Sequence, residues 1–244
     1  MANFVLVHGA WHGGWCWHRV VRALTAAGHR VHAVTLTGLG ERAHLLSSAI
    51  TLETHIADVA QTLEAEELDD VVLAVHSYAG MIGTAIADRM AARLRHLVYV
   101  DAVVPLPGES WSSTQATTTR EARLAAAKAS PDYTLAPPDP QVFGLSGADH
   151  AWLLRRQTPH PGHTYTAPLD FDIARVAAVR RTFVSCTAPA LATIDAIRLR
   201  LADPSFWGGH WQRGGRVIEI KTGHDPMVSA PGDLVRVLVD GIGP

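Results

Sequence analysis

The sequence has few cysteines, little net charge and no long apolar run. Its 244 residues include only two cysteines, Cys16 and Cys186, too few for a disulfide framework or a thiolate metal site. A formal net charge of -2 gives no basic surface for nucleic acid. No segment approaches the ~20 apolar residues of a membrane-spanning helix, and residues 4–7 already have the pattern of a strand rather than a targeting signal. We therefore expect no nucleic-acid or membrane partner and, by default, a cytoplasmic location.

What is present is typical of a globular α/β protein. Hydrophobic residues make up 48% of the chain and charged residues 18%. The length suits one large domain with a sizeable core. Short apolar runs rich in β-branched residues predict six strands, at 4–7, 31–34, 71–75, 97–100, 182–185 and 217–220. Helical spacing predicts helices between them, at 17–28, 52–66, 78–93, 194–201 and 232–239. This alternation predicts a doubly wound, mostly parallel sheet of about six strands.

One long segment interrupts the alternation. Residues 105–180 hold most of the prolines, a Ser/Thr-rich stretch and an alanine-rich helical piece at 120–128, with no clear strand. An insertion of this length is more typical of a helical cap than of a structureless loop. We therefore predict a core formed by residues 1–104 and 181–244, and a cap formed by residues 105–180.

Ser77 is the strongest candidate nucleophile. It follows the apolar run 71–75 directly and precedes a helical stretch, which is the strand, sharp turn and helix context of a nucleophile elbow. Small residues are needed two positions before and after it, where strand and helix backbones approach closely. Ala79 meets that need, whereas Val75 departs from it. The alternative is a plain turn in which Ser77 caps the helix.

His224 is the candidate base. It stands immediately after the last predicted strand, in a loop from which an imidazole can reach the elbow. An isolated serine hydroxyl is a weak nucleophile at neutral pH and needs such a base to take its proton. After the first strand, the turn at residues 8–10 can aim the backbone N–H of Ala10 at the same point as that of Tyr78, forming an oxyanion hole.

Four motifs together resemble the α/β-hydrolase superfamily: HGAWHGGWCW at 8–17, TLTGLGER at 35–42, HSYAG at 76–80 and GH at 223–224. They are most similar to a cofactor-free branch that includes plant methyl-ester esterases, hydroxynitrile lyases and related bacterial esterases. The resemblance spans nearly the whole chain and weakens in the predicted cap. It implies that Ser77 attacks an acyl carbon, that His224 is the general acid and base, and that Ala10 and Tyr78 donate to the oxyanion.

The acid of the triad departs from this family's usual pattern. That acid normally follows the next-to-last strand, but residues 184–190 contain no carboxylate. Asp101 directly follows the strand expected beside the elbow strand, and the order Ser77, Asp101, His224 fits the fold. We predict that Asp101 holds the tautomer of His224 and stabilises its imidazolium. Asp195 and Asp225 remain alternatives, and Asp101 could instead cap the loop that follows it.

No cofactor or metal is expected. Glycines at 38 and 40 follow a strand but do not open a helix, as a dinucleotide fingerprint would. The histidine pairs 8/12 and 160/163 have no glutamate or cysteine partner at ligand spacing. Cap aromatics, Trp111 and Trp152 among them, are candidates to line a substrate pocket.

These residues predict a serine hydrolase that cleaves a small, largely apolar carboxylic ester through an acyl-enzyme. The lyases of the similar branch carry lysine after the catalytic histidine and threonine at the oxyanion turn, where this chain has Asp225 and Ala10. That difference favours the esterase. A biosynthetic cyclase or lyase that uses His224 and the oxyanion hole without acylation, or a ligand-binding receptor, remains an alternative. The sequence does not decide the oligomeric state.

Overall fold

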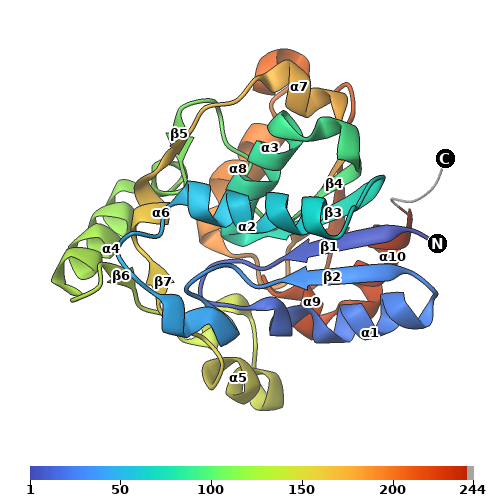
Figure 1. The fold of residues 1–244 in the computed structure, drawn as a ribbon. Coiled ribbons are helices and arrows are strands. Elements are labelled where there is room, and N and C mark those ends of the chain that lie inside the picture. Colours follow the sequence, from blue (N-terminus) through green and yellow to red (C-terminus); the bar gives the residue numbers. More distant parts are fainter. Residues whose placement is uncertain (241–244) are drawn as a thin grey trace.

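A computed structural model describes residues 1–240 and shows a six-stranded parallel sheet with helices on both faces (Figure 1). The last four residues of the predicted core, 241–244, lie outside the described residues. The strand order is β10-β9-β4-β3-β1-β2, and every neighbouring pair is parallel. The strands are β1 (Asn3–Val7), β2 (Arg30–Val34), β3 (Val71–His76), β4 (Leu94–Val100), β9 (Arg181–Cys186) and β10 (Gly215–Ile220). The predicted doubly wound fold and all six predicted strands are confirmed.

Two helical layers cover the sheet. Helix α1 (His18–Ala26) packs against α10 (Pro231–Asp240), while α2 (Leu52–Ala65) packs against α3 (Gly80–Arg89). The remaining core helices are α8 (Asp195–Ala202) and the short α9 (Pro226–Ser229). Each of the five predicted core helices has a counterpart at its predicted position, and α9 was not predicted. No helix among residues 1–240 combines the length and apolar character that crossing a membrane requires.

The central strands of the sheet are buried because both of their faces are covered. All six residues of β3 and of β9 are buried, whereas the edge strands β2 and β10 are partly exposed. In register, Ala74 of β3 lies between Leu6 of β1 and Val98 of β4. Since the strands are parallel, the loops after β1, β3, β4 and β10 leave from one edge of the sheet. The candidate triad and oxyanion residues, Ala10, Ser77, Tyr78, Asp101 and His224, follow these strands at that edge.

The segment 105–180 runs between β4 and β9 without adding a strand to the main sheet. It contains α4 (Thr117–Ala129), α5 (Gly147–Leu154), α6 (His163–Thr166) and α7 (Ile173–Ala178). It also contains four two-residue strands, which the sequence did not predict: β5 (Glu109–Ser110) pairs with β8 (Pro168–Leu169), and β6 (Thr134–Leu135) pairs with β7 (His160–Pro161). Helix α7 packs against α3 of the predicted core. The division into core and cap stays a prediction.

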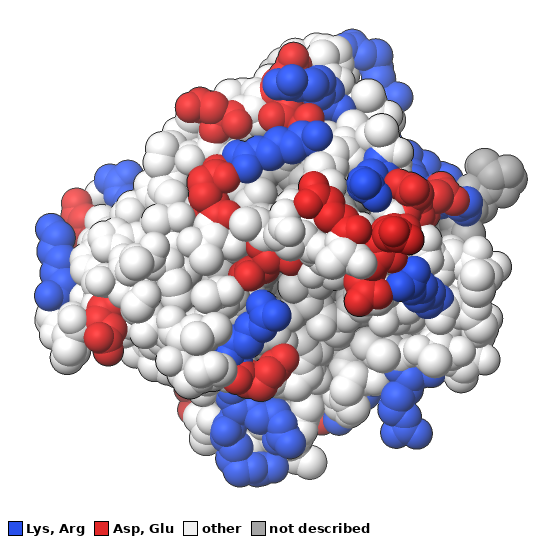
Figure 2. Space-filling model, viewed as in Figure 1, with Lys and Arg blue, Asp and Glu red and all other residues white. Residues whose placement is uncertain are grey.

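The surface seen in Figure 2 carries charges of both signs. Basic and acidic side chains lie next to one another on this face and do not form separate basic and acidic patches. Ion pairs among the described residues include Arg89 with Glu53 and Arg30 with Glu66.

Candidate active site

Ser77 lies at a strained turn between β3 and α3. Its φ is +55°, in the left-handed region that non-glycine residues seldom adopt. The turn is tight enough that a Cβ at Gly80 would lie 1.8 Å from the carbonyl oxygen of Val103. The backbone N–H of Val103 also donates to the carbonyl of Ser77 at 2.9 Å. The loop after β4 thus holds the turn, and strain of this kind is typical of functional sites.

Val75 fits this turn because the facing helix has a glycine. A Cβ at Gly83 of α3 would lie 2.8 Å from Cγ2 of Val75. A glycine at position 75 would leave space between the strand and the helix. Here Gly83 of α3, which has no side chain, leaves that space instead. The departure at Val75 does not prevent the turn.

His224 contacts Ser77 directly. Its Nε2 lies 3.0 Å from Oγ of Ser77, and its Nδ1 lies 2.7 Å from Oδ2 of Asp101. Since an ionised carboxylate only accepts hydrogen bonds, Nδ1 carries the proton and Nε2 is free to accept the serine hydroxyl. His224 and Asp101 are buried, while Ser77 is partly exposed. The backbone of His224 is held by the carbonyl of Phe143, which accepts its N–H at 2.9 Å.

Asp101 is held from both sides at the end of β4. Its Oδ1 accepts from Nη2 of Arg198 at 2.7 Å and from the backbone N–H of Cys186 at 3.2 Å. Asp101 is fully buried, so these donors replace the water that an ionised carboxylate needs. Of the two alternative acids, Asp195 pairs with Arg198 at 2.7 Å from a side chain that is 58% exposed. Among the described residues, only Asp101 has a carboxylate within hydrogen-bond distance of the His224 ring.

The turn after β1 packs against the elbow. A Cβ at Gly9 would lie 2.8 Å from Cβ of Ser77, so only glycine allows this approach. Nδ1 of His8 donates to the carbonyl of Gly9 at 2.7 Å, and Nε2 accepts from the N–H of Leu36 at 3.1 Å. Burial lowers the pKa of His8 to about 3, so its ring is neutral. In a trans peptide the carbonyl of Gly9 and the N–H of Ala10 point in opposite directions, so His8 fixes the direction of that N–H.

Of the two tryptophans expected to line a substrate pocket, Trp111 lies close to the elbow and Trp152 does not. The ring of Trp111 lies 5.2 Å from that of Tyr78, the residue after the serine. Trp152 packs instead on Trp15 and His18, each with ring centroids 5.1 Å away. Phe143, a further aromatic residue of the predicted cap, lies 5.5 Å from the ring of His224.

One group of side chains within residues 1–240 has the composition of a metal site. The ligand atoms of His76, His224 and Asp225 lie within 4.8 Å of one another, and all three residues are buried. Both ring nitrogens of His224 already have partners in Ser77 and Asp101. The donor set therefore fits hydrogen bonding within the protein better than it fits a metal, and the expectation of no metal stays a prediction.

Comparison with known proteins agrees with the fold. Residues 4–237 match the model of the alpha/beta hydrolase family. The chain is 39% identical to a carbendazim hydrolyzing esterase of Nocardioides sp. (strain SG-4G), with 98% of each chain covered. It is 28% identical to methylesterase 7 of Arabidopsis thaliana, over 98% of this chain and 95% of that one.

Solved structures show the same fold. An extracellular alpha/beta-hydrolase from a Paenibacillus species superposes with a TM-score of 0.81 at 20% identity, with 99% of each chain covered. The predicted resemblance to plant methyl-ester esterases and related bacterial esterases is confirmed. This chain belongs to the alpha/beta hydrolase family.

Proposed function

We propose that the protein hydrolyses a small carboxylic ester through an acyl-enzyme on Ser77. The observation that carries this proposal is the continuous hydrogen-bond chain from Asp101 through His224 to Ser77, with distances of 2.7 and 3.0 Å. This order matches that of a nucleophile, its base and the acid that orients the base. The similarity to a carbendazim hydrolyzing esterase and to a methylesterase supports the same activity.

In the first half-reaction, Oγ of Ser77 bonds to the acyl carbon while its proton passes to Nε2 of His224. The backbone N–H groups of Ala10 and Tyr78 stabilise the oxyanion that forms. The ester C–O bond then breaks, and the alcohol leaves with the proton from His224. In the second half-reaction, His224 takes a proton from water, the hydroxide attacks the acyl carbon, and the acid product leaves Ser77 with its hydroxyl restored.

The substrate we propose is small and largely apolar. Trp111 and Phe143 are the cap aromatics whose rings lie next to Tyr78 and His224, and they favour apolar groups near the reacting bond. Trp152 is not part of this proposed pocket, because its ring packs on Trp15 and His18.

We also propose a cytoplasmic location, which the two buried free thiols, Cys16 and Cys186, favour. Cell fractionation with an antibody against the chain tests this, and recovery from the medium would contradict it.

A panel of small methyl carboxylic esters tests the activity, with carbendazim, the compound named for the similar esterase, assayed in parallel. We expect release of acid from at least one member by the wild type and none above background by Ser77→Ala. Equal turnover by Ser77→Ala would contradict the acyl-enzyme. A folded wild type that turns over no ester would favour the alternatives, a cyclase or lyase that uses His224 without acylation, or a receptor.

A further inference from the structure

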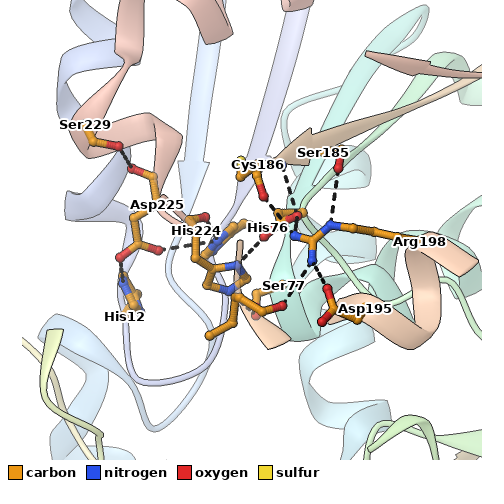
Figure 3. A network of polar contacts seen from close by, with 12 residues as sticks. His12, His76, Ser77, Ser185, Cys186, Asp195, Arg198, His224, Asp225 and Ser229 are labelled. Carbon is orange, nitrogen blue, oxygen red and sulfur yellow. Dashed lines mark hydrogen bonds and ion pairs between the residues drawn. The ribbon is translucent and has the colours of Figure 1, made fainter. Parts of the chain in front are cut away.

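A second buried carboxylate, Asp225, lies next to His224 but outside the hydrogen-bond chain to Ser77. Its side chain is fully buried between two histidine rings (Figure 3). Oδ2 lies 3.2 Å from Nε2 of His12, and Oδ1 lies 3.4 Å from Nε2 of His76. A buried carboxylate is costly unless charge and hydrogen bonds compensate it, so these two contacts need an explanation.

The His12 ring is an imidazolium. Its Nδ1 lies 2.6 Å from the carbonyl oxygen of Ala10, and its Nε2 faces the carboxylate of Asp225. Neither acceptor has a hydrogen to give, so both ring nitrogens of His12 must carry one. Burial alone would lower the pKa of His12, but the charge of Asp225 and the hydrogen bonds raise it. Burial would raise the pKa of Asp225, but His12 brings it down to about 2.

His76 is the neutral partner. Its Nε2 donates to the carbonyl of His224 at 2.9 Å and is also close to Asp225. Burial, together with the neighbouring His224, lowers the pKa of His76 to about 3. His76 is the last residue of β3 and directly precedes Ser77, so its ring joins the strand end to the loop of the base.

Asp225 therefore contacts all three loops that carry the proposed chemistry. Through His12 it reaches the carbonyl of Ala10, through His76 it reaches the elbow, and through its own backbone it adjoins His224. We propose that Asp225 is a positioning residue. It fixes the relative positions of the turn at residues 8–10, the elbow at Ser77 and the base His224. This inference rests on the proposed ester hydrolysis. Asp225 touches neither the nucleophile nor the reacting bond, so it is a positioning residue and not a catalytic one.

Asp225→Asn tests the proposal, with Asp88→Asn as a matched control. Asp88 has a side chain that is 10% exposed, pairs with Arg175 at 2.8 Å and lies at the far end of α3 from Ser77. For Asp225→Asn we expect kcat to fall by on the order of 10²-fold, the effect of misplacing reacting groups by about 1 Å, with KM close to wild type. Asp88→Asn should keep both constants near wild type. Wild-type kcat in Asp225→Asn, or a change in KM alone, would overturn the proposal.

Two further readouts separate positioning from loss of folding. An alkyl boronic acid, which forms a tetrahedral adduct on the serine, should bind more weakly to Asp225→Asn in proportion to kcat. In ¹⁵N spectra of the wild type, His12 should show two protonated ring nitrogens, with the signals identified by their loss in His12→Gln. That signature should disappear in Asp225→Asn. If it persists, Asp225 does not hold the charge of His12 and the proposal fails.

A double variant keeps the test decisive if Asp225→Asn does not fold. His12→Gln combined with Asp225→Asn replaces the ion pair by two neutral amides that can bond to each other. A folded double variant with reduced kcat supports the proposal, and one with wild-type kcat overturns it. Failure of ester hydrolysis itself would be distinguishable, because the wild type would then neither turn over esters nor react with a fluorophosphonate.

Discussion

The role of Asp101 leads to a quantitative prediction for Asp101→Asn. Oδ1 of Asp101 accepts from Arg198 and from the N–H of Cys186, so in the variant this position must keep an oxygen. The amide nitrogen of the new side chain must then face Nδ1 of His224. Two donors cannot face each other, so the proton of His224 moves to Nε2, where it faces Ser77 and blocks proton removal.

A histidine held in the wrong tautomer lowers kcat by about 10⁴-fold in triads of this type, which corresponds to about 5.4 kcal/mol of transition-state free energy. Asparagine is the suitable replacement because Asp101 has a φ of +43°, and asparagine tolerates this left-handed backbone better than most residues. The variant should therefore fold, and circular dichroism with thermal unfolding would check that it does.

The assay is steady-state hydrolysis of the best ester of the panel, with Asp195→Asn as the matched control. Asp195 pairs with the same arginine, Arg198, from an exposed position, so its loss leaves Asp101 and His224 in contact. We expect wild-type rates from Asp195→Asn. The reasoning would be refuted if Asp101→Asn kept more than about a tenth of the wild-type kcat, far above the expected 10⁴-fold loss.

Two further predictions concern packing and pH. Gly9→Ala would place a Cβ 2.8 Å from that of Ser77, so we expect activity to fall on the order of 10²-fold in the ester assay, and retained activity would contradict the close packing. Burial lowers the pKa of His8 and His76 to about 3 and that of His55 to about 4, below the ordinary 6.5. These neutral histidines therefore make their full contribution to the free energy of unfolding above pH 6.5. The contribution is lost as pH falls toward 4, by about 2 kcal/mol for each histidine at pH 5. Urea unfolding at pH 7 and pH 5 measures the loss, and equal midpoints would contradict it.

The fold could be predicted from the sequence because its central strands are buried on both faces. Their continuous β-branched runs stand out, and the alternation with helices fixes the parallel arrangement. The positions of Ser77, Asp101 and His224 directly after strands were enough to predict that they meet at one edge of the sheet. The four two-residue strands in 105–180 were not predicted, because so short a strand has no periodicity to detect.

The supporting contacts could not be predicted because they depend on how separate elements pack together. Arg198 reaches Asp101 across 97 positions, and nothing in the spacing identifies that arginine. Gly83 makes room for Val75, a contact that depends on how α3 packs on β3. The sequence predicted Asp225 only as an alternative acid. Its burial between His12 and His76 could not be predicted, because it requires three segments that are distant in the chain to come together.

Covalent labelling of Ser77 tests the central claim most directly. The wild type and Ser77→Ala are treated with a fluorophosphonate at neutral pH, and their intact masses are recorded. A single adduct on the wild type and none on Ser77→Ala is the predicted result, because only a serine with a working base beside it reacts. A folded wild type that stays unlabelled, with access of the probe verified by its competition with a bound ester, would contradict the acyl-enzyme account.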